Sequence, residues 1–315
     1  MRGRALAVLG PTATGKSELA LWLAQRLDGE VINADAMQLY RGMDIGTAKL
    51  PPEERRGIPH HLLDVLEVTE AASVAAYQRQ ARATLEGLLA AGRTAIVVGG
   101  SGLYVQAIFD ELEFPGTDPE LRARLLAEVR RRGAAVLHER LTLVDPVAAA
   151  HILPSNGRRI ARALEVYELT GRPFPATIPK PGAARYDATL IGLDQAVERL
   201  DERVDRRAEA MFGCGLLEEV RRLCARDFRA GSTAPRALGY AQALQVIDST
   251  CDTAEAIAAT ARATRRFVRR QRSWFRRDPR IQWLDSAAVD LREQALATAL
   301  GRPSDPESHG RGGRE

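Results

Sequence analysis

A glycine-rich segment near the start of the chain has the residue types and spacing of a phosphate site. It follows the pattern G-x-x-x-x-G-K-S, in which backbone N–H groups and the start of the next helix form a positive cup. The predicted phosphate contacts are Gly10, Pro11, Thr12, Ala13, Thr14, Gly15, Lys16 and Ser17. Lys16 adds a point charge, and the Ser17 hydroxyl can bind a Mg²⁺ ion that also contacts the phosphates. A nucleotide is the usual ligand of such a loop, but nothing in the loop requires one.

Two further candidates follow apolar segments. Asp35 closes the segment 30–35, where a carboxylate can accept a proton or hold a metal; a turn or capping aspartate is the structural alternative. Phosphate-loop ATPases usually carry an Asp after a later strand to hold Mg²⁺. Here the segment 94–98 instead runs into Gly99-Gly100-Ser101, which argues against an ATPase or GTPase. Ser101 is a candidate hydroxyl contact or a simple turn serine.

A dense run of arginine extends from residue 262 to 277. Eight of these 16 residues are arginine, and no acidic residue occurs before Asp278. On a helix, one face would carry Phe267, Val268, Gln271, Trp274 and Phe275, with most of the arginines opposite. A solvated basic face is the structural alternative. The density of one sign of charge favours a polyanion, whose binding would depend on salt.

The elements that must position these residues alternate between strand and helix. Apolar segments at 4–9, 30–35 and 94–98 predict buried parallel strands, and helical periodicity follows at 19–27 and 73–91. The predicted fold class is therefore α/β, a P-loop-type parallel sheet core flanked by helices. Because such sheets bind ligands at the carboxyl ends of their strands, Asp35 should face the phosphate loop.

The alternation stops near residue 113. Residues 113–187 are helical and rich in arginine, and they end in a stretch with four prolines; residues 188–194 then have the pattern of another strand. We predict a catalytic core formed by 1–112 and 188–285, which ends in basic helices. An all-helical domain is inserted at 113–187, and a disordered tail follows at 301–315.

Composition excludes several classes of protein. Hydrophobic residues make up 45% and charged residues 27%, as in ordinary globular proteins, and no apolar run is long enough for a membrane span. Three scattered cysteines and five histidines offer no disulfide framework or zinc pattern. No signal-peptide cleavage site follows the apolar N-terminal stretch, so we expect a cytoplasmic protein. Nothing indicates an obligate dimer, and we expect a monomer.

Seven motifs, in their order along the chain, resemble the bacterial tRNA dimethylallyltransferases, also called isopentenyl-diphosphate:tRNA transferases. They are GPTATGKS, NADAMQLYRGMDIGTAK, PHHLLD, VVGGSGLY, RRIARALEVYELTG, PRALGYAQ and RRQRSWFRRD. The resemblance covers about residues 5–285. It implies transfer of a dimethylallyl group from dimethylallyl diphosphate to a tRNA. The acceptor would be N6 of the adenine 3′ of the anticodon, in tRNAs reading codons that begin with U. The product would be N6-isopentenyladenosine.

The resemblance also assigns roles. Asp35 matches the general base, and Ser101 matches a hydroxyl contact that is usually threonine. Residues 10–17 would bind the diphosphate, with Mg²⁺ on Ser17. An arginine from the segment DERVDRR would clamp the diphosphate; Arg203 and Arg207 both match by position, and Arg203 is favoured as the catalytic one. An adenine stacked in an anticodon loop must be flipped out to reach a buried pocket.

Contacts with the tRNA anticodon stem-loop are implied in the core, in the insertion domain and in the arginine run. They are Asp35, Ala36, Met37, Gln38, Ser101, Arg158, Arg159, Ile160, Ala161, Arg162, Arg236, Ala237, Leu238, Gly239, Tyr240, Ala241, Arg269 and Arg270. Three of them depart from the family pattern, which usually has serine at Ala36, lysine or arginine at Ala241 and glutamine at Arg158. These departures bear on tRNA preference rather than on the reaction.

Three other functions remain open. A P-loop kinase of a small metabolite would use residues 10–17 and Asp35 but leave the arginine run without a role. An adenylate dimethylallyltransferase would prenylate free AMP-type nucleotides and need no large basic surface. An RNA-binding protein with a vestigial loop would not need the intact Gly15-Lys16-Ser17.

Overall fold

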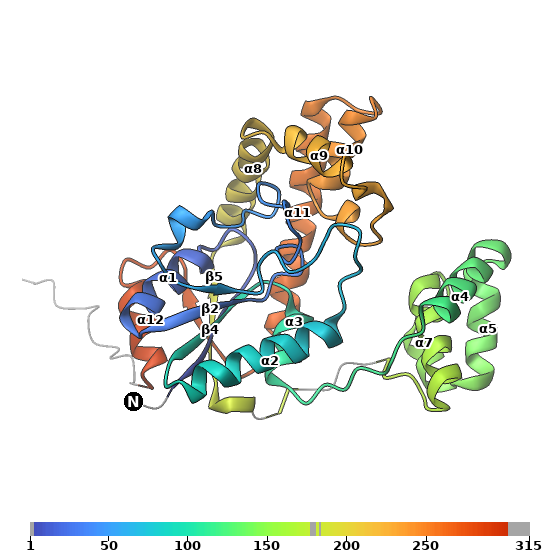
Figure 1. The fold of residues 1–315 in the computed structure, drawn as a ribbon, viewed down its shortest axis with the longest axis horizontal. Helices are drawn as coiled ribbons and strands as arrows, with labels where there is room; N and C mark the ends of the chain where they lie inside the picture. Colours follow the sequence, from blue (N-terminus) through green and yellow to red (C-terminus); the bar gives the residue numbers. More distant parts are fainter. Residues whose placement is uncertain (1–2, 177–180, 183, 302–315) are drawn as a thin grey trace, which may run out of the picture. The chain divides into compact units, whose positions relative to one another are not determined.

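The chain is built around one parallel sheet, seen here in a computed structural model that describes residues 3–176, 181–182 and 184–301. Within these residues six strands have the order β3-β2-β4-β1-β5-β6. Figure 1 shows the sheet between the helices that flank it. They are β1 (Ala5–Leu9), β2 (Gly29–Asn33), β3 (His60–His61), β4 (Thr94–Gly99), β5 (Thr189–Asp194) and β6 (Ile281–Asp285). The predicted α/β class, a parallel sheet core flanked by helices, is confirmed.

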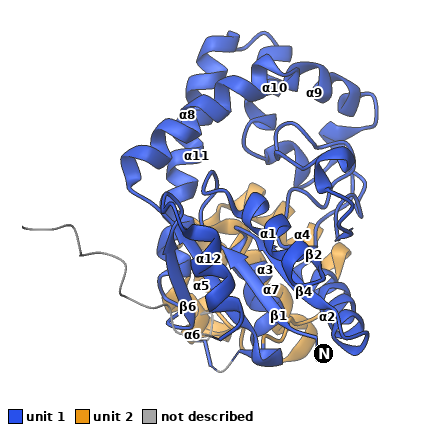
Figure 2. Ribbon diagram, turned by 90° about the vertical axis from the view of Figure 1, so that its left-hand side faces the viewer, with its two compact units in different colours: residues 1–111, 181–315 blue, residues 112–180 orange. Residues whose placement is uncertain are grey.

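The helices of the first compact unit are α1 (Lys16–Arg26), α2 (Val74–Ala90), α3 (Gly102–Phe109), α8 (Val197–Gly213), α9 (Leu216–Cys224), α10 (Tyr240–Ile247), α11 (Thr253–Phe275) and α12 (Leu291–Ala299). Those of the second are α4 (Pro119–Arg132), α5 (Ala134–Val144), α6 (Pro146–His151) and α7 (Gly157–Thr170). Figure 2 colours the two units, residues 1–111 with 181–315 and residues 112–180. The helical insertion was expected at 113–187, and the second unit spans residues 112–180.

Strand order explains how distant segments come together. β4 pairs with β1 on one side and with β2 on the other, and all three run parallel. Their carboxyl ends therefore lie side by side at one edge of the sheet. The phosphate loop follows β1, Asp35 follows β2, and Ser101 follows β4. Three segments spread over almost 100 residues of sequence are thus neighbours in the fold.

Alternate residues of the buried strands pack on opposite faces of the sheet. Ala7 and Val97 face a core formed with α2, α3 and the end of α11. Val8 and Val98 face a second core formed with α1 and α12. The strands are apolar on both faces because helices cover both, as expected for a parallel sheet.

A further apolar cluster lies beyond the sheet, where the loop after β2 packs against α8–α10. Tyr40 and Met43 from the loop meet Phe212, Leu216 and Tyr240, and all five are buried. The insertion unit has a core of its own around Leu125, Leu141 and Leu164. At its base Glu165 is fully buried and accepts hydrogen bonds from Thr117, Asp118 and Arg122.

Several boundaries differ from those expected. The second strand ends at Asn33 rather than Asp35, because the Asn33 side chain turns back onto the backbone of Asp35. β3, β6 and α12 were not predicted: β3 has two residues, and β6 lies just beyond the arginine run. The predicted tail lies outside the described residues from 302 onward. No helix in the described part of the chain has the length and apolar character to cross a bilayer.

Candidate functional site

The phosphate loop is held in a conformation that glycine makes possible. Gly10 has φ +134°, and a Cβ atom there would lie 2.2 Å from the Leu193 carbonyl oxygen of β5. The carbonyl of Pro11 accepts hydrogen bonds from Lys16 Nζ at 2.6 Å and from Thr14 Oγ1 at 2.9 Å. The lysine side chain therefore reaches back across the turn of the loop, and its ammonium lies over the backbone of Pro11.

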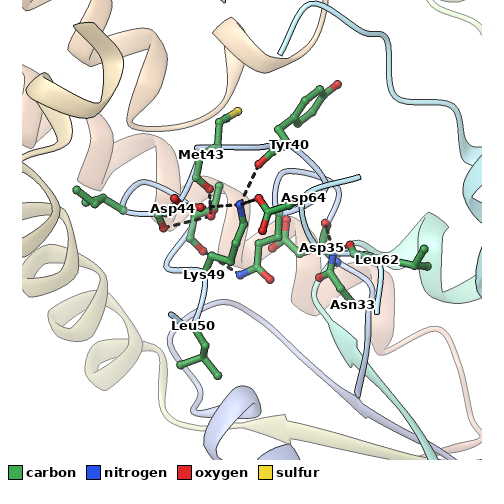
Figure 3. Close-up of polar contacts among 12 residues, drawn as sticks. Asn33, Asp35, Tyr40, Met43, Asp44, Lys49, Leu50, Leu62 and Asp64 are labelled. Atoms are coloured by element: carbon green, nitrogen blue, oxygen red, sulfur yellow. Dashed lines mark hydrogen bonds and ion pairs between the residues drawn. The ribbon is translucent and has the colours of Figure 1, made fainter. Parts of the chain in front are cut away.

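Asp35 is fixed by the residue that ends β2. Asn33 accepts from the Asp35 N–H at 2.9 Å and donates to the carbonyls of Asp35 at 3.0 Å and Leu62 at 2.9 Å (Figure 3). Tyr77 Oη donates to the Asn33 carbonyl at 2.8 Å. Asp35 Oδ1 accepts from the Met37 N–H at 2.9 Å. Oδ2 accepts no hydrogen bond from the described residues, which leaves it available to take a proton.

Ser101 connects the end of β4 to the same segment. Its Oγ accepts from the Ala36 N–H at 3.2 Å, and its own N–H donates to the Ala34 carbonyl at 3.3 Å. The backbones approach so closely that a Cβ on Gly99 would lie 2.2 Å from the Ala34 carbonyl oxygen. Ser101 thus contacts the residue next to Asp35, and its role as a hydroxyl contact stays a prediction.

An arginine of α8 reaches the phosphate loop, and it is Arg207 rather than the favoured Arg203. Arg207 donates to Thr12 Oγ1 at 2.9 Å and to the Thr47 carbonyl at 3.2 Å. Arg203 lies one helical turn earlier and is exposed. Of the two arginines, Arg207 is the one that contacts the phosphate loop, which favours it over Arg203 as the candidate for an anion held there; both roles stay predictions.

Electrostatics tie these residues into one site. Burial lowers the pKa of Lys16 from 10.5 to about 7; the Asp35 carboxylate opposes this shift, and the Arg207 guanidinium adds to it. Burial also lowers the pKa of Arg207, against the opposing charge of Asp35. Lys16 and Arg207 carry two positive charges, and Asp35 compensates for only one of them. A bound polyanion would therefore stabilise the charged forms of both cations. The arrangement can bind a phosphate or diphosphate and place a proton acceptor beside it.

The loop between Asp35 and Leu50 is organised by a buried lysine. The Lys49 side chain is only 3% exposed. Its ammonium donates to the Tyr40 carbonyl at 2.9 Å, to Asp44 at 2.7 Å and to Asp64 at 2.6 Å (Figure 3). These three bonds satisfy all the donors of a lysine. Lys49 thereby ties the segment MDIGTAK to the aspartate of PHHLLD.

The same loop contacts both Arg207 and Gln38, the second of which is a predicted tRNA contact. The Thr47 carbonyl accepts from Arg207 and, at 3.2 Å, from Gln38 Nε2. On its other side, the buried Glu219 accepts from the backbone N–H groups of Asp44 and Ile45. Lys49 and Glu219 therefore hold the loop from two directions.

Replacing Lys49 with methionine should destabilise the fold by about 1–3 kcal/mol, because the buried Tyr40 carbonyl loses its donor, while the Asp44 and Asp64 carboxylates are 54% and 40% exposed and keep contact with water. Urea denaturation measures this loss. Asp64→Asn removes one charge from the same cluster at a position where the side chain is 40% exposed, and it should cost about 1 kcal/mol or less. Equal losses in the two variants would contradict the central place of Lys49.

The arginine run forms α11, but its charges are more compensated than the sequence indicates. Acids that are distant in sequence pair with four of the arginines. The pairs are Arg265–Asp205, Arg269–Asp201, Arg272–Asp194 and Arg276–Asp194. Among the described residues, Arg262, Arg266, Arg270 and Arg277 have no carboxylate partner. Fewer of the arginine charges are therefore free than the sequence suggests, and of the two predicted tRNA contacts in the run, Arg270 is uncompensated and Arg269 is paired.

The predicted tRNA segments are only partly accessible. In α7, Ile160 and Ala161 are buried in the core of the insertion unit, and Arg162 donates to the carbonyls of Pro115 and Gly116. Arg158 and Arg159 are exposed.

In the segment 236–241, Ala237, Gly239 and Tyr240 are buried, and the Tyr240 hydroxyl donates to Glu219. Arg236, Leu238 and Ala241 keep exposed or partly exposed side chains. Direct side-chain contacts from both segments are thus limited to a few residues, and the tRNA roles stay predictions.

Sequence reasoning missed Asn33, Lys49, Glu219 and Gln271. Lys49 and Asn33 stand inside motifs that carried the resemblance, yet nothing in the sequence says that their side chains are buried and bonded. Gln271 gave one usable signal, since it is the polar member of the predicted apolar face of the arginine run. Glu219 gave none.

The sequence is similar to a known protein family over most of its length. The IPP transferase family model matches residues 38–278. A tRNA dimethylallyltransferase of Streptomyces avermitilis is 62% identical over 290 residues, which are 92% of this chain and 93% of the relative. One from Saccharopolyspora erythraea is 65% identical over 288 residues, 91% of this chain and 93% of the relative.

Solved structures of tRNA-modifying transferases are also similar to this chain. The tRNA isopentenylpyrophosphate transferase of Bacillus halodurans has a TM-score of 0.69 and 36% identity, with 95% of this chain and 97% of that chain covered. A eukaryotic dimethylallyltransferase acting on tRNA has a TM-score of 0.80 and 26% identity, with 97% and 81% covered.

Proposed function

The chain belongs to the IPP transferase family, and from this premise we propose that it is a tRNA prenyltransferase that uses dimethylallyl diphosphate. The acceptor is N6 of the adenine 3′ of the anticodon in tRNAs that read codons beginning with U. The observation that carries this proposal is the convergence of Lys16, Arg207 and Asp35 at the edge of the sheet. It combines an anion clamp with a proton acceptor.

The clamp stabilises the leaving group. The bond between C1 of the dimethylallyl group and the diphosphate oxygen breaks, and the electron pair goes to the diphosphate. The loop N–H groups, Lys16 and Arg207 are positioned to donate to the oxygens on which this negative charge develops. Such preorganised donors lower the activation barrier because they stabilise the transition state more than the ground state. The N–H groups belong to residues 13–17, because Pro11 has none and the Thr12 N–H is already bonded to Gln271.

The base completes the transfer. As the N6–C1 bond forms, the exocyclic amine becomes more acidic and must lose a proton. Asp35 accepts it at Oδ2, while Oδ1 keeps its hydrogen bond from Met37. Asn33 and Ser101 hold the backbone around this carboxylate in place.

A Mg²⁺ ion fits this site as a companion of the diphosphate. No group of three or more metal-ligating side chains occurs in the described part of the chain, and the Ser17 side chain is exposed at the mouth of the loop. Mg²⁺ commonly takes most of its ligands from substrate phosphates and water. We propose Ser17 as its protein ligand; the ion would add positive charge opposite the leaving group.

The tRNA meets the enzyme through exposed arginines. Flipping the adenine out of the anticodon loop costs a few kcal/mol, and phosphate contacts from Arg158, Arg236 and Arg270 would offset this cost. We propose that the protein acts as a monomer. A cytoplasmic location follows from the proposed substrate.

Neutralising Arg270 should weaken tRNA binding and reduce the slope of log Kd against log salt by about 0.7–0.9, the value for one lost phosphate contact. The measurement is a salt titration of binding for Arg270→Gln. The adjacent Arg269→Gln is the matched variant. Because Asp201 already pairs with Arg269, its slope should change less. Equal changes would show that pairing with Asp201 leaves Arg269 available to the tRNA.

Diphosphate binding should be linked to proton uptake by Lys16. Below pH 7 Lys16 is already charged, since its pKa in the free protein is about 7. A bound anion raises that pKa, so above pH 7 binding takes up a proton and the affinity falls by up to about tenfold per pH unit.

Calorimetry with inorganic pyrophosphate measures this linkage. The variant Lys16→Met shares the titration of the ligand but lacks the ammonium, and subtracting its pH profile isolates the lysine. Identical profiles in the two proteins would contradict the linkage.

The proposed reaction is tested by incubating the protein with labelled dimethylallyl diphosphate, Mg²⁺ and unmodified tRNA. Label is expected at the adenine 3′ of the anticodon. AMP replaces tRNA in a parallel reaction, and transfer to AMP alone would identify an adenylate dimethylallyltransferase instead. ATP turnover in place of prenyl transfer would identify a kinase.

A further inference from the structure

Gln271 is a buried polar residue in the middle of the arginine helix. Its exposure is 5%, and it lies on the buried face of α11. Its Oε1 accepts from the Thr12 N–H at 3.0 Å, and its Nε2 donates to the Gly100 carbonyl at 2.9 Å. One side chain thereby connects α11, the phosphate loop and the turn after β4.

The two partners dictate the orientation of this amide. An N–H requires the oxygen of the glutamine, and a carbonyl requires its nitrogen, so a flipped amide would lose both bonds. Burying a primary amide is costly unless it is hydrogen-bonded. The site is also shaped for it, because a Cβ on Gly100 would lie 2.3 Å from Gln271 Nε2. Only glycine at position 100 lets the amide approach this closely.

Thr12 is held from two sides. Gln271 takes its backbone N–H, and its Oγ1 accepts from Arg207 at 2.9 Å. The helices that supply these two residues are themselves joined, since Arg265 and Arg269 of α11 pair with Asp205 and Asp201 of α8. The paired helices α8 and α11 therefore both bond to Thr12, α11 to its backbone N–H and α8 to its side chain.

We propose that Gln271 is a positioning residue for diphosphate binding: by fixing Thr12 it presets both the loop and the Arg207 guanidinium. It does not contact the diphosphate itself. The inference deepens the proposed function and rests on it for the identity of the ligand. Without Gln271 the Thr12 N–H loses its partner, the loop relaxes, and Arg207 loses the hydroxyl that orients it.

The test compares Gln271→Met, which keeps length but loses both bonds, with the wild-type protein. The Kd of inorganic pyrophosphate with Mg²⁺, measured by calorimetry, should rise about tenfold, the effect of leaving one buried N–H unpaired. The KM for dimethylallyl diphosphate should rise in parallel, while the Kd for unmodified tRNA stays within about twofold. Gln271→Glu keeps the acceptor for Thr12 but turns an oxygen toward the Gly100 carbonyl, and it should bind pyrophosphate no better than the methionine variant.

Phe275→Leu is the control for a general weakening of α11. Phe275 is buried one turn further along the helix and makes no hydrogen bond to the phosphate loop. It should lower the thermal midpoint without changing pyrophosphate affinity. Wild-type affinity in a folded Gln271→Met variant, or an equal loss in Phe275→Leu, would overturn the proposal. A wild-type protein that binds pyrophosphate but prenylates no tRNA would refute the proposed function and leave the pyrophosphate comparison valid.

Discussion

Asparagine in place of Asp35 should lower the turnover of tRNA prenylation by about 10²-fold or more, because the reaction would lose the general base that we propose. The substitution is conservative in structure. Asparagine keeps an Oδ1 that can accept from the Met37 N–H, so the turn after β2 should survive. What disappears is the ability to take the proton from N6. The measurement is single-turnover transfer of labelled dimethylallyl groups to saturating tRNA.

Two comparisons make this result specific. The Kd of the variant for unmodified tRNA should remain close to that of wild type, which separates chemistry from binding. Asp44→Asn removes a carboxylate from the same loop, but one that faces Lys49, and its turnover should fall by less than about tenfold. A near-normal rate for Asp35→Asn would refute the base assignment.

Arg207→Met should reduce kcat/KM for dimethylallyl diphosphate by about 10²–10³-fold, the usual cost of removing one donor from a developing anion. The inhibition constant of pyrophosphate should rise with it, since the same guanidinium holds the product. Arg203→Met is the matched control. It removes the same side chain from the same helix, one turn away, where the arginine is exposed.

The pair also decides between the two arginines that fit the sequence pattern. Arg203→Met should stay within about threefold of wild type. A larger loss in Arg203→Met than in Arg207→Met would restore the sequence-based preference and place the diphosphate elsewhere on α8. Thermal denaturation of both variants is needed as a check, because Arg207 also bonds to the Thr47 carbonyl.

The main elements of the fold were predictable because their signals are local. The apolar run before Gly10 and the glycines of the loop predicted a strand, a turn and a helix, and β1 and α1 confirm them. The alternation of strand and helix predicted the parallel sheet. β6 and α12 were missed; in β6, four of the five side chains are partly buried or exposed, so its pattern is too weak to stand out beside the arginine run.

The choice between Arg203 and Arg207 shows where local signals end. Both lie on the same amphipathic helix, four residues apart. Which of them meets Thr12 depends on how α8 packs against the loop after β2, through contacts such as that with the Thr47 carbonyl. The charge of α11 is a similar case: its partners Asp194, Asp201 and Asp205 are about 60–80 residues away in sequence.

The sequence by itself determined the type of chemistry, because a phosphate loop, a carboxylate after the second strand and a glycine turn after the next are encoded in short segments. Tertiary structure alone decided which side chains complete the site. Strand order placed the ends of β1, β2 and β4 together, and packing of α8 and α11 brought Arg207 to the side chain of Thr12 and Gln271 to its backbone N–H. The reason is physical: a buried polar side chain is selected by the partners that satisfy its hydrogen bonds, and those partners come from elsewhere in the chain.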